Sequence, residues 1–189
     1  DVYKRQLVDG WVPGAEPGWE PWIVRESGRT LNDTFAEEFF RYLAPRDRKA
    51  MDYRTFDFDK DPAKLAWIRE VLDATNPDLS AFRARGGRMV MFFGWADPAL
   101  NPLMAVKYYE SVMAKMGDKV VPEFFRFFTV PGMFHCGGGV GCNTVDWITP
   151  VVDWVEKGQA PASILTSRVV NGQTLMTRPV CPWPNFVCP

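Results

Sequence analysis

We predict that this chain has an α/β fold built on a parallel β-sheet, with an antiparallel hairpin near its C-terminus. Two short apolar runs, 88–93 and 124–130, are bounded by glycine or proline, as expected of strands buried on both faces of a parallel sheet. A helical pattern separates them, and strand, helix, strand is the repeating unit of such a sheet. Further along, Asn171-Gly172 lies between two strand-like segments and favours a two-residue hairpin turn.

The first part of the chain is rich in aromatic residues and is predicted to be a loop followed by two helices. Residues 11–22 read WVPGAEPGWEPW, and this density of Pro, Gly and Trp does not allow a regular helix. The apolar residues of 32–43 keep helical spacing, with Asn32 or Asp33 placed to cap the first turn. A second helix is predicted from Asp61-Pro62, an N-cap followed by proline, to about Ala74.

The predicted strand–helix–strand unit has clear boundaries. The first strand is entered through Gly86-Gly87 and left through Gly94. The helix is opened by Asn101-Pro102 and stopped by Gly117, and its inward face is predicted to carry Leu103, Val106, Tyr109, Val112, Met113 and Met116. The second strand ends at Pro131-Gly132.

A glycine-rich loop, 132–143, leads from the second strand into the last helix. That helix ends at Lys157-Gly158, and we predict that it starts near Thr149, because proline is tolerated in a first turn and Pro150 would disrupt a later one. The hairpin strands are predicted over 163–170 and 173–178.

Composition and charge exclude several classes of protein. The chain has 189 residues, of which 47% are hydrophobic and 24% charged, values typical of a globular protein with a buried core. The formal net charge is −1, and no basic run is interleaved with aromatics, so we predict no nucleic-acid binding. The apolar runs are too short to span a bilayer, so we predict no membrane insertion.

The first six residues are set apart from the fold. Asp1 to Gln6 read DVYKRQ, which matches the in-frame translation of a sequencing-library adapter, and an ordinary N-terminal hexapeptide is the alternative. With the adapter interpretation, we expect the natural protein to extend upstream.

Asp97 and His135 are the candidate catalytic pair. Asp97 follows the first predicted strand, and His135, the single histidine of the chain, follows the second. Ligands gather at the carboxyl ends of parallel strands, so the two side chains are expected at one edge of the sheet. Acid before base is also the chain order of α/β-hydrolases, in which a serine precedes both. The alternative is that Asp97 forms a turn and His135 serves as a structural hydrogen-bonding group.

A resemblance favours the catalytic interpretation. The stretches DLSAF, RARGGRMVMFFGWADP, YYESV, FFRFFTVPGMFHCGGG and VVDWVEKGQAP, together with RPVCPWP near the end, resemble the tannase and feruloyl esterase family. This resemblance implies the C-terminal part of an α/β-hydrolase fold, preceded by the end of a lid segment. It implies a secreted or periplasmic serine esterase acting on small aromatic or phenolic esters, with Asp97 as the acid and His135 as the base.

The resemblance also implies features that lie outside this sequence. In the family, a Cys-Ser motif carries the nucleophile, and its cysteine forms a disulfide with the cysteine after the histidine, which Cys136 matches. No Cys-Ser or Gly-x-Ser-x-Gly motif occurs in these 189 residues. We therefore expect the nucleophile, the signal peptide and a lid calcium site upstream, and no cofactor in this chain. The predicted division is 1–6 adapter, 7–75 lid end and connecting helices, and 76–189 catalytic part.

Cysteines and aromatic residues complete the candidate sites. One disulfide among Cys142, Cys181 and Cys188 fits an oxidising compartment; Cys181 with Cys188 is the simplest pairing, although sequence does not determine connectivity. A zinc site is disfavoured because the chain lacks a C-x-x-C pair, so we predict no metal. Trp95 and Phe134 could border a substrate pocket, whereas core packing is the more frequent use of such residues.

Overall fold

The computed structural model describes residues 9–47, 49–185 and 188, so the hexapeptide 1–6 lies outside the described residues. The chain forms two compact units. Unit 1 combines the residues up to Gly18 with those from Asn76 onward, and unit 2 is Trp19–Thr75. Residues 9–18, which the sequence-based division groups with the lid segment, therefore lie in the same unit as the predicted catalytic part. Within the described residues, no helix has the length and apolar character needed to cross a bilayer.

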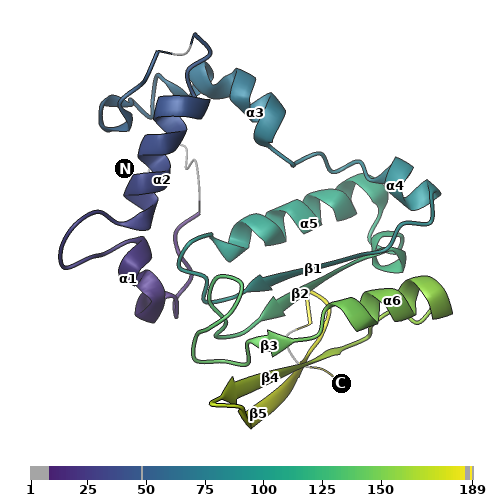
Figure 1. Cartoon of the computed structure of the whole chain (residues 1–189). Helices are drawn as coiled ribbons and strands as arrows, with labels where there is room; N and C mark the ends of the chain where they lie inside the picture. Colours follow the sequence, from purple (N-terminus) through teal and green to yellow (C-terminus); the bar gives the residue numbers. More distant parts are fainter. Residues whose placement is uncertain (1–8, 48, 186–187, 189) are drawn as a thin grey trace. The chain divides into compact units, whose positions relative to one another are not determined.

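The parallel strand pair predicted from the sequence forms the centre of unit 1. β1 (Met89–Gly94) and β2 (Phe125–Val130) pair in parallel, from Met89 opposite Phe125 to Gly94 opposite Val130. Helix α5 (Pro102–Met116) connects them and runs alongside the pair (Figure 1). The side chain of Asn101 caps α5 by accepting a hydrogen bond from the Leu103 amide, and Gly117, with φ of 99°, ends the helix, as predicted.

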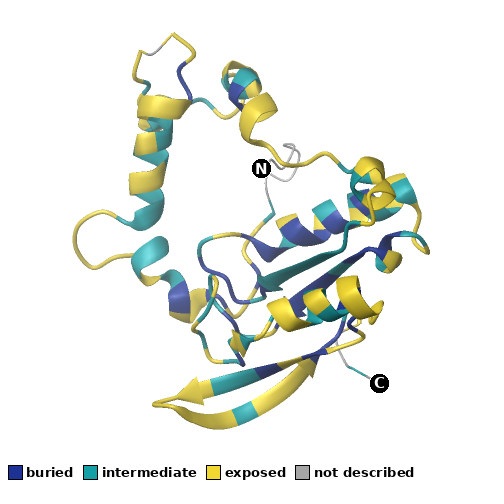
Figure 2. Cartoon of the chain, turned by 45° about the vertical axis from the view of Figure 1, so that its right-hand side comes forward, coloured by how far each residue is buried: buried dark blue, intermediate teal, exposed yellow. Residues whose placement is uncertain are grey.

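The two faces of this strand pair are covered differently. On one face, Phe125 and Phe127 pack with Tyr109 and Val112 of α5. On the other face, Phe128 packs with Ile164 and Val180 of the hairpin, and the Phe92 ring stacks on Trp147 at 4.2 Å. β2 is buried almost throughout, whereas β1 is mostly half-buried, in contrast to the predicted full burial (Figure 2). The reason is that the second side of β2 is covered by the C-terminal segment, where Phe128 bridges to Pro182 and the Trp183 amide donates to the Phe127 carbonyl at 2.7 Å, whereas among the described strands β1 pairs with β2 alone.

The hairpin forms as predicted and gains a third strand. β4 (Ile164–Val170) and β5 (Gln173–Val180) are antiparallel, and Asn171 and Gly172 both adopt positive φ, 50° and 77°, as the tight turn requires. The short strand β3 (Thr144–Val145) adds to the outer side of β4, a pairing that the sequence did not reveal.

The remaining helices of unit 1 are short, apart from α6. α6 (Ile148–Lys157) begins one residue before the predicted start, where Asp146 Oδ1 accepts hydrogen bonds from the Ile148 and Thr149 amides, each at 3.0 Å. α4 (Ser80–Ala84) precedes β1. Two 3₁₀ turns, η1 (Glu16–Gly18) and η5 (Val121–Glu123), complete the unit.

Unit 2 is a set of short helices. They are α1 (Trp19–Trp22), α2 (Leu31–Glu38), the π-helix η2 (Phe39–Leu43), the 3₁₀ turns η3 (Tyr53–Thr55) and η4 (Pro62–Leu65), and α3 (Ala66–Leu72). α1 is interrupted at Glu20 (ψ 128°), because a residue before proline avoids the helical region. The rings of Phe40, Tyr53 and Phe56 pack together, and the Trp67 indole donates to the Ala44 carbonyl at 2.9 Å.

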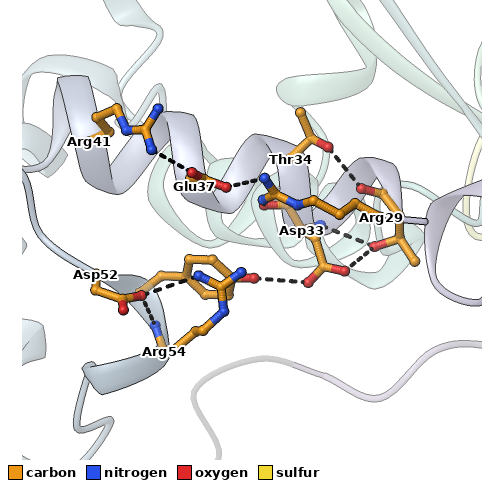
Figure 3. A network of polar contacts seen from close by, with 9 residues as sticks. Arg29, Asp33, Thr34, Glu37, Arg41, Asp52 and Arg54 are labelled. Atoms are coloured by element: carbon orange, nitrogen blue, oxygen red, sulfur yellow. Dashed lines mark hydrogen bonds and ion pairs between the residues drawn. The ribbon is translucent and has the colours of Figure 1, made fainter.

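A polar network fixes the start of α2 (Figure 3). Thr30, rather than the predicted Asn32 or Asp33, is the N-cap, since its hydroxyl oxygen accepts a hydrogen bond from the Asp33 amide at 3.1 Å. The Asp33 carboxylate in turn accepts hydrogen bonds from the hydroxyls of Thr30 and Tyr53, which together hold the pKa of Asp33 below its ordinary value. Arg29 and Arg41 both pair with Glu37 on the next turn of the helix.

Candidate active site

Asp97 lies in the turn that follows β1 and is 2% exposed. One of its carboxylate oxygens, Oδ1, accepts hydrogen bonds from the amides of Ala99 at 2.7 Å and Leu100 at 3.0 Å. These bonds hold the carboxylate in one orientation and leave Oδ2 directed to another partner. A short polar side chain that can bond to the backbone two or three residues ahead explains why aspartate closes this turn.

His135 lies in the glycine-rich loop that follows β2. The loop is closed at its base by a hydrogen bond from the Gly141 amide to the Gly132 carbonyl at 3.0 Å, and Met133 bridges to Gly139 within it. Gly132, Gly138 and Gly139 adopt positive φ, which makes the tight path of the loop accessible. The His135 side chain is about one-third exposed, so its imidazole remains accessible to other groups although the loop holds it in place.

The structure brings the two side chains together. His135 Nδ1 lies 2.9 Å from Asp97 Oδ2, although the residues are 38 positions apart in sequence. A carboxylate at this distance favours the imidazole tautomer that carries its proton on Nδ1, in which the lone pair that can accept a proton is on Nε2. Because Oδ1 is occupied by the turn amides, the orientation of the imidazole is fixed through Oδ2.

The Asp97 turn and the His135 loop are also in direct backbone contact. Gly94, which the sequence did not link to the site, makes this close approach possible. The Ala96 amide donates to the Met133 carbonyl at 3.0 Å. A side chain on Gly94 would place its Cβ 2.4 Å from the Phe134 carbonyl oxygen and 2.5 Å from that of Met133. Only glycine therefore allows this approach; the available signal was a glycine closing a strand directly before the Asp97 turn.

A small hollow adjoins the pair. It has a volume of about 200 Å³. Besides Asp97 and His135, it is lined by Phe92, Phe93, Gly94, Leu100 and Cys136, so its lining is mainly apolar. A larger cavity of about 310 Å³ lies by the hairpin and is bordered by residues such as Thr129, Cys142 and Met176, but by neither Asp97 nor His135. The smaller hollow is the one relevant to Asp97 and His135, because it alone of the two borders their side chains.

The other predicted site residues are placed as follows. Cys136, next to His135, is exposed and is a free thiol. The Phe134 ring packs against Gly18 of unit 1. Trp95 stacks on Trp183, with ring centroids 6.0 Å apart, and packs against the core cluster of α5 and β2; neither Trp95 nor Phe134 borders the 200 Å³ hollow.

Of the remaining cysteines, Cys181 and Cys188 form a disulfide, which was the simplest pairing predicted, and Cys142 is a buried free thiol. Within the described part of the chain, no group of three or more His, Cys, Asp or Glu side chains is arranged to hold a metal ion.

Comparison with known proteins assigns the family. The family model for "Tannase and feruloyl esterase" matches residues 10–187. The chain belongs to this family. A mono(2-hydroxyethyl) terephthalate hydrolase of Piscinibacter sakaiensis is 40% identical over 98% of the chain, which covers 35% of that protein. A probable feruloyl esterase of Arthroderma benhamiae is 37% identical over 61% of the chain and 22% of that protein.

Solved structures of the family agree with the α/β fold. An esterase from Aspergillus oryzae superposes with a TM-score of 0.78 at 25% identity, over 92% of this chain and 37% of that one. Feruloyl esterase B from the same organism gives a TM-score of 0.73 at 22% identity. This chain therefore spans about a third of the length of the terephthalate monoester hydrolase and of the Aspergillus oryzae esterase.

Proposed function

We propose that this chain supplies the acid, Asp97, and the base, His135, of a serine carboxylic-ester hydrolase that acts on aromatic or phenolic esters. The observation that carries the proposal is the 2.9 Å contact between His135 Nδ1 and Asp97 Oδ2 at the carboxyl ends of two parallel strands. Membership of a family of ester hydrolases supports it. The alternative, in which both residues are structural, would not require them to meet.

In the proposed mechanism, the nucleophile is a serine in the portion of the family's chain that this sequence does not span. His135 Nε2 takes the proton of that serine as it attacks the ester carbonyl, and then gives the proton to the leaving alcohol. Asp97 holds the imidazole in the required tautomer and stabilises the imidazolium. Water activated by His135 then hydrolyses the acyl-enzyme and restores the serine.

The proposed substrate class rests on the acyl groups named in two relatives and on the residues that line the hollow. Terephthalate and ferulate, named in the relatives, are aromatic acyl groups joined through esters. The hollow beside His135 is lined mainly by apolar residues, among them Phe92, Phe93 and Leu100, which suit an apolar group. Trp95 and Phe134 remain proposed contributors to a pocket that the remainder of the family's chain would help to form.

Three further parts of the proposal concern the rest of the protein. Cys136 pairs with the cysteine that precedes the nucleophile, which would tie the nucleophile's loop to that of His135. Residues 7–75 are the end of the lid, and residues 76–189 are part of the catalytic domain. The protein acts outside the cytoplasm, as the Cys181–Cys188 disulfide supports.

The test uses the whole protein, obtained by recovering the reading frame upstream of this sequence. We expect it to hydrolyse methyl ferulate and monoesters of terephthalate faster than esters of aliphatic acids. Asp97→Asn, which keeps the shape of the side chain and removes its charge, should lower kcat by about 10⁴-fold. Glu156→Gln, an exposed change on α6, is the control and should leave kcat unaltered.

Two results would contradict the proposal. An Asp97→Asn enzyme with the kcat of the parent would show that the carboxylate plays no part in catalysis. A whole protein that binds these esters without hydrolysing any of them would favour a non-catalytic binding role.

A further inference from the structure

The segment Asp9–Gly18 of unit 1 reaches both loops of the candidate active site. Val12, Ala15 and Gly18, three residues apart, are buried, so one side of the segment faces the interior of the unit. The sequence-based division places this segment at the end of the lid, and none of the hydrogen bonds described above joins it to Asp97 or His135. Its contacts are with the residues that flank them.

The first of these contacts is made by Asn101, four residues after Asp97. Asn101 is 7% exposed, and its Nδ2 donates to the carbonyls of Asp9 and Gly10, each at 2.9 Å. Its Oδ1 caps α5 at the same time. The side-chain amide therefore joins the end of the Asp97 turn to the segment, and the ion pair between Lys107 and Asp9 at 2.8 Å adds to that attachment.

The second contact is made by Gly18, which lies between the two loops. A Cβ at this position would be 3.0 Å from Pro98 Cγ and 3.2 Å from Cε2 and Cζ of the Phe134 ring. Pro98 follows Asp97, and Phe134 precedes His135. One backbone position therefore packs against the immediate neighbours of both the acid and the base.

We propose that Asp9–Gly18 is a strap that holds the Asp97 and His135 loops at their working separation, with Gly18 and Asn101 as positioning residues. The strap acts by packing Gly18 against both Pro98 and Phe134, so that Oδ2 stays in reach of Nδ1. This inference rests on the proposed function for its catalytic meaning. The geometry itself can be measured without any hydrolysis.

The experiment uses this chain, in which His135 is the single histidine, so imidazole NMR signals need no assignment among histidines. The readout is the His135 Nδ1–H proton and its exchange rate with water. Gly18→Ala adds only a methyl group, because the φ of Gly18 lies outside the positive range that disfavours side chains. Gly10→Ala is the matched control, since it is in the same segment with no atom within 4 Å of the added Cβ.

A second variant tests the other contact. Asn101→Asp keeps an oxygen to cap α5 and loses both hydrogen bonds donated to the segment. We expect Gly18→Ala and Asn101→Asp each to raise the Nδ1–H exchange rate by about tenfold, in line with the weakening of one charge-assisted hydrogen bond, while Gly10→Ala leaves it unchanged. Circular dichroism establishes that each variant is folded.

Asp97→Asn separates the two ways in which the inference could fail. If that variant alters the Nδ1–H signal while folded Gly18→Ala and Asn101→Asp leave it as in the parent, the strap is refuted and the catalytic pair stands. If Asp97→Asn itself leaves the signal unchanged, the pairing is absent in solution, and the proposed function falls together with the strap.

Discussion

Replacing Gly94 by alanine should separate the two loops that carry Asp97 and His135. The added Cβ would lie 2.4 Å from the Phe134 carbonyl oxygen, and such contacts are essentially never shorter than 3.0 Å. The His135 loop must therefore retreat by at least about 0.6 Å, because the obstructing atoms belong to the backbone and have no alternative rotamer. The same retreat would lengthen the 2.9 Å contact between Nδ1 and Oδ2 to about 3.5 Å, at the limit of a hydrogen bond.

The cost in stability follows from this overlap. Forcing one extra methyl group into a packed site costs about 1–3 kcal/mol, and each kcal/mol lowers the melting temperature of a domain of this size by about 2–4 °C. We therefore expect Gly94→Ala to melt about 2–12 °C below the parent, measured by circular dichroism. The His135 Nδ1–H signal should broaden or disappear in the same variant.

Gly137→Ala is the control for this prediction. Gly137 lies in the same loop as His135, yet its added Cβ would meet no atom within 4 Å, and its φ is not in the positive range. This variant should melt with the parent. Equal melting temperatures for Gly94→Ala and Gly137→Ala, with an unaltered Nδ1–H signal in both, would refute the inferred backbone contact between the loops.

Three further predictions concern other parts of unit 1. In the native chain, Cys136 should react with a maleimide and buried Cys142 only after denaturation, so mass spectrometry that finds both labelled at one rate would contradict the burial assigned to Cys142. Thr166→Val should destabilise the hairpin by about 1 kcal/mol, because the fully buried Thr166 hydroxyl donates to the Arg178 carbonyl at 2.7 Å; an unchanged urea midpoint would count against this. Hydrogen bonds from Thr149 and the Ile148 amide hold the pKa of Asp146 below its ordinary value of 3.8. The ionised Asp146 carboxylate therefore stabilises the folded chain above pH 3.8, and this stabilisation is lost as the pH falls through the lowered pKa. The urea midpoint of Asp146→Asn should thus depend less on pH below about pH 4 than that of the parent, and parallel pH profiles would exclude this role.

The sequence was most informative where local pattern and chain order act together. The strands around 88–93 and 124–130 were recognisable because glycine and proline bound short apolar runs, and β1 and β2 form a parallel pair. Asn171-Gly172 identified the hairpin, because both positions of such a turn need positive φ. The two-residue strand β3 is too short to leave a pattern, and its pairing with β4 depends on tertiary packing.

Burial was harder to predict than helical structure. Periodicity predicted the helix that contains α3, but Val71 on its apolar side is 71% exposed, because a pattern defines a face without defining what packs against it. The cap of α2 was misplaced by two or three residues, since Thr30, Asn32 and Asp33 are all able to cap and only the backbone geometry selects Thr30.

The sequence likewise predicted some residues of the candidate site and gave no sign of others. Asp97 and His135 were found from residue type and from their positions after two strands, and the structure brings them to 2.9 Å. Gly94, Gly18 and Asn101 were not linked to the site, because their importance lies in contacts with backbone or side chains distant in sequence. Single-sequence patterns carry no information about such contacts.

The most direct test of the Asp97–His135 pair as catalytic acid and base is the kcat/KM of His135→Ala in the whole protein, measured on an aromatic ester with and without added imidazole. Removing the base should lower kcat/KM by about 10⁴-fold or more, and free imidazole should restore part of the loss by accepting the nucleophile's proton. A His135→Ala enzyme with the kcat/KM of the parent, unaffected by imidazole, would contradict the assignment.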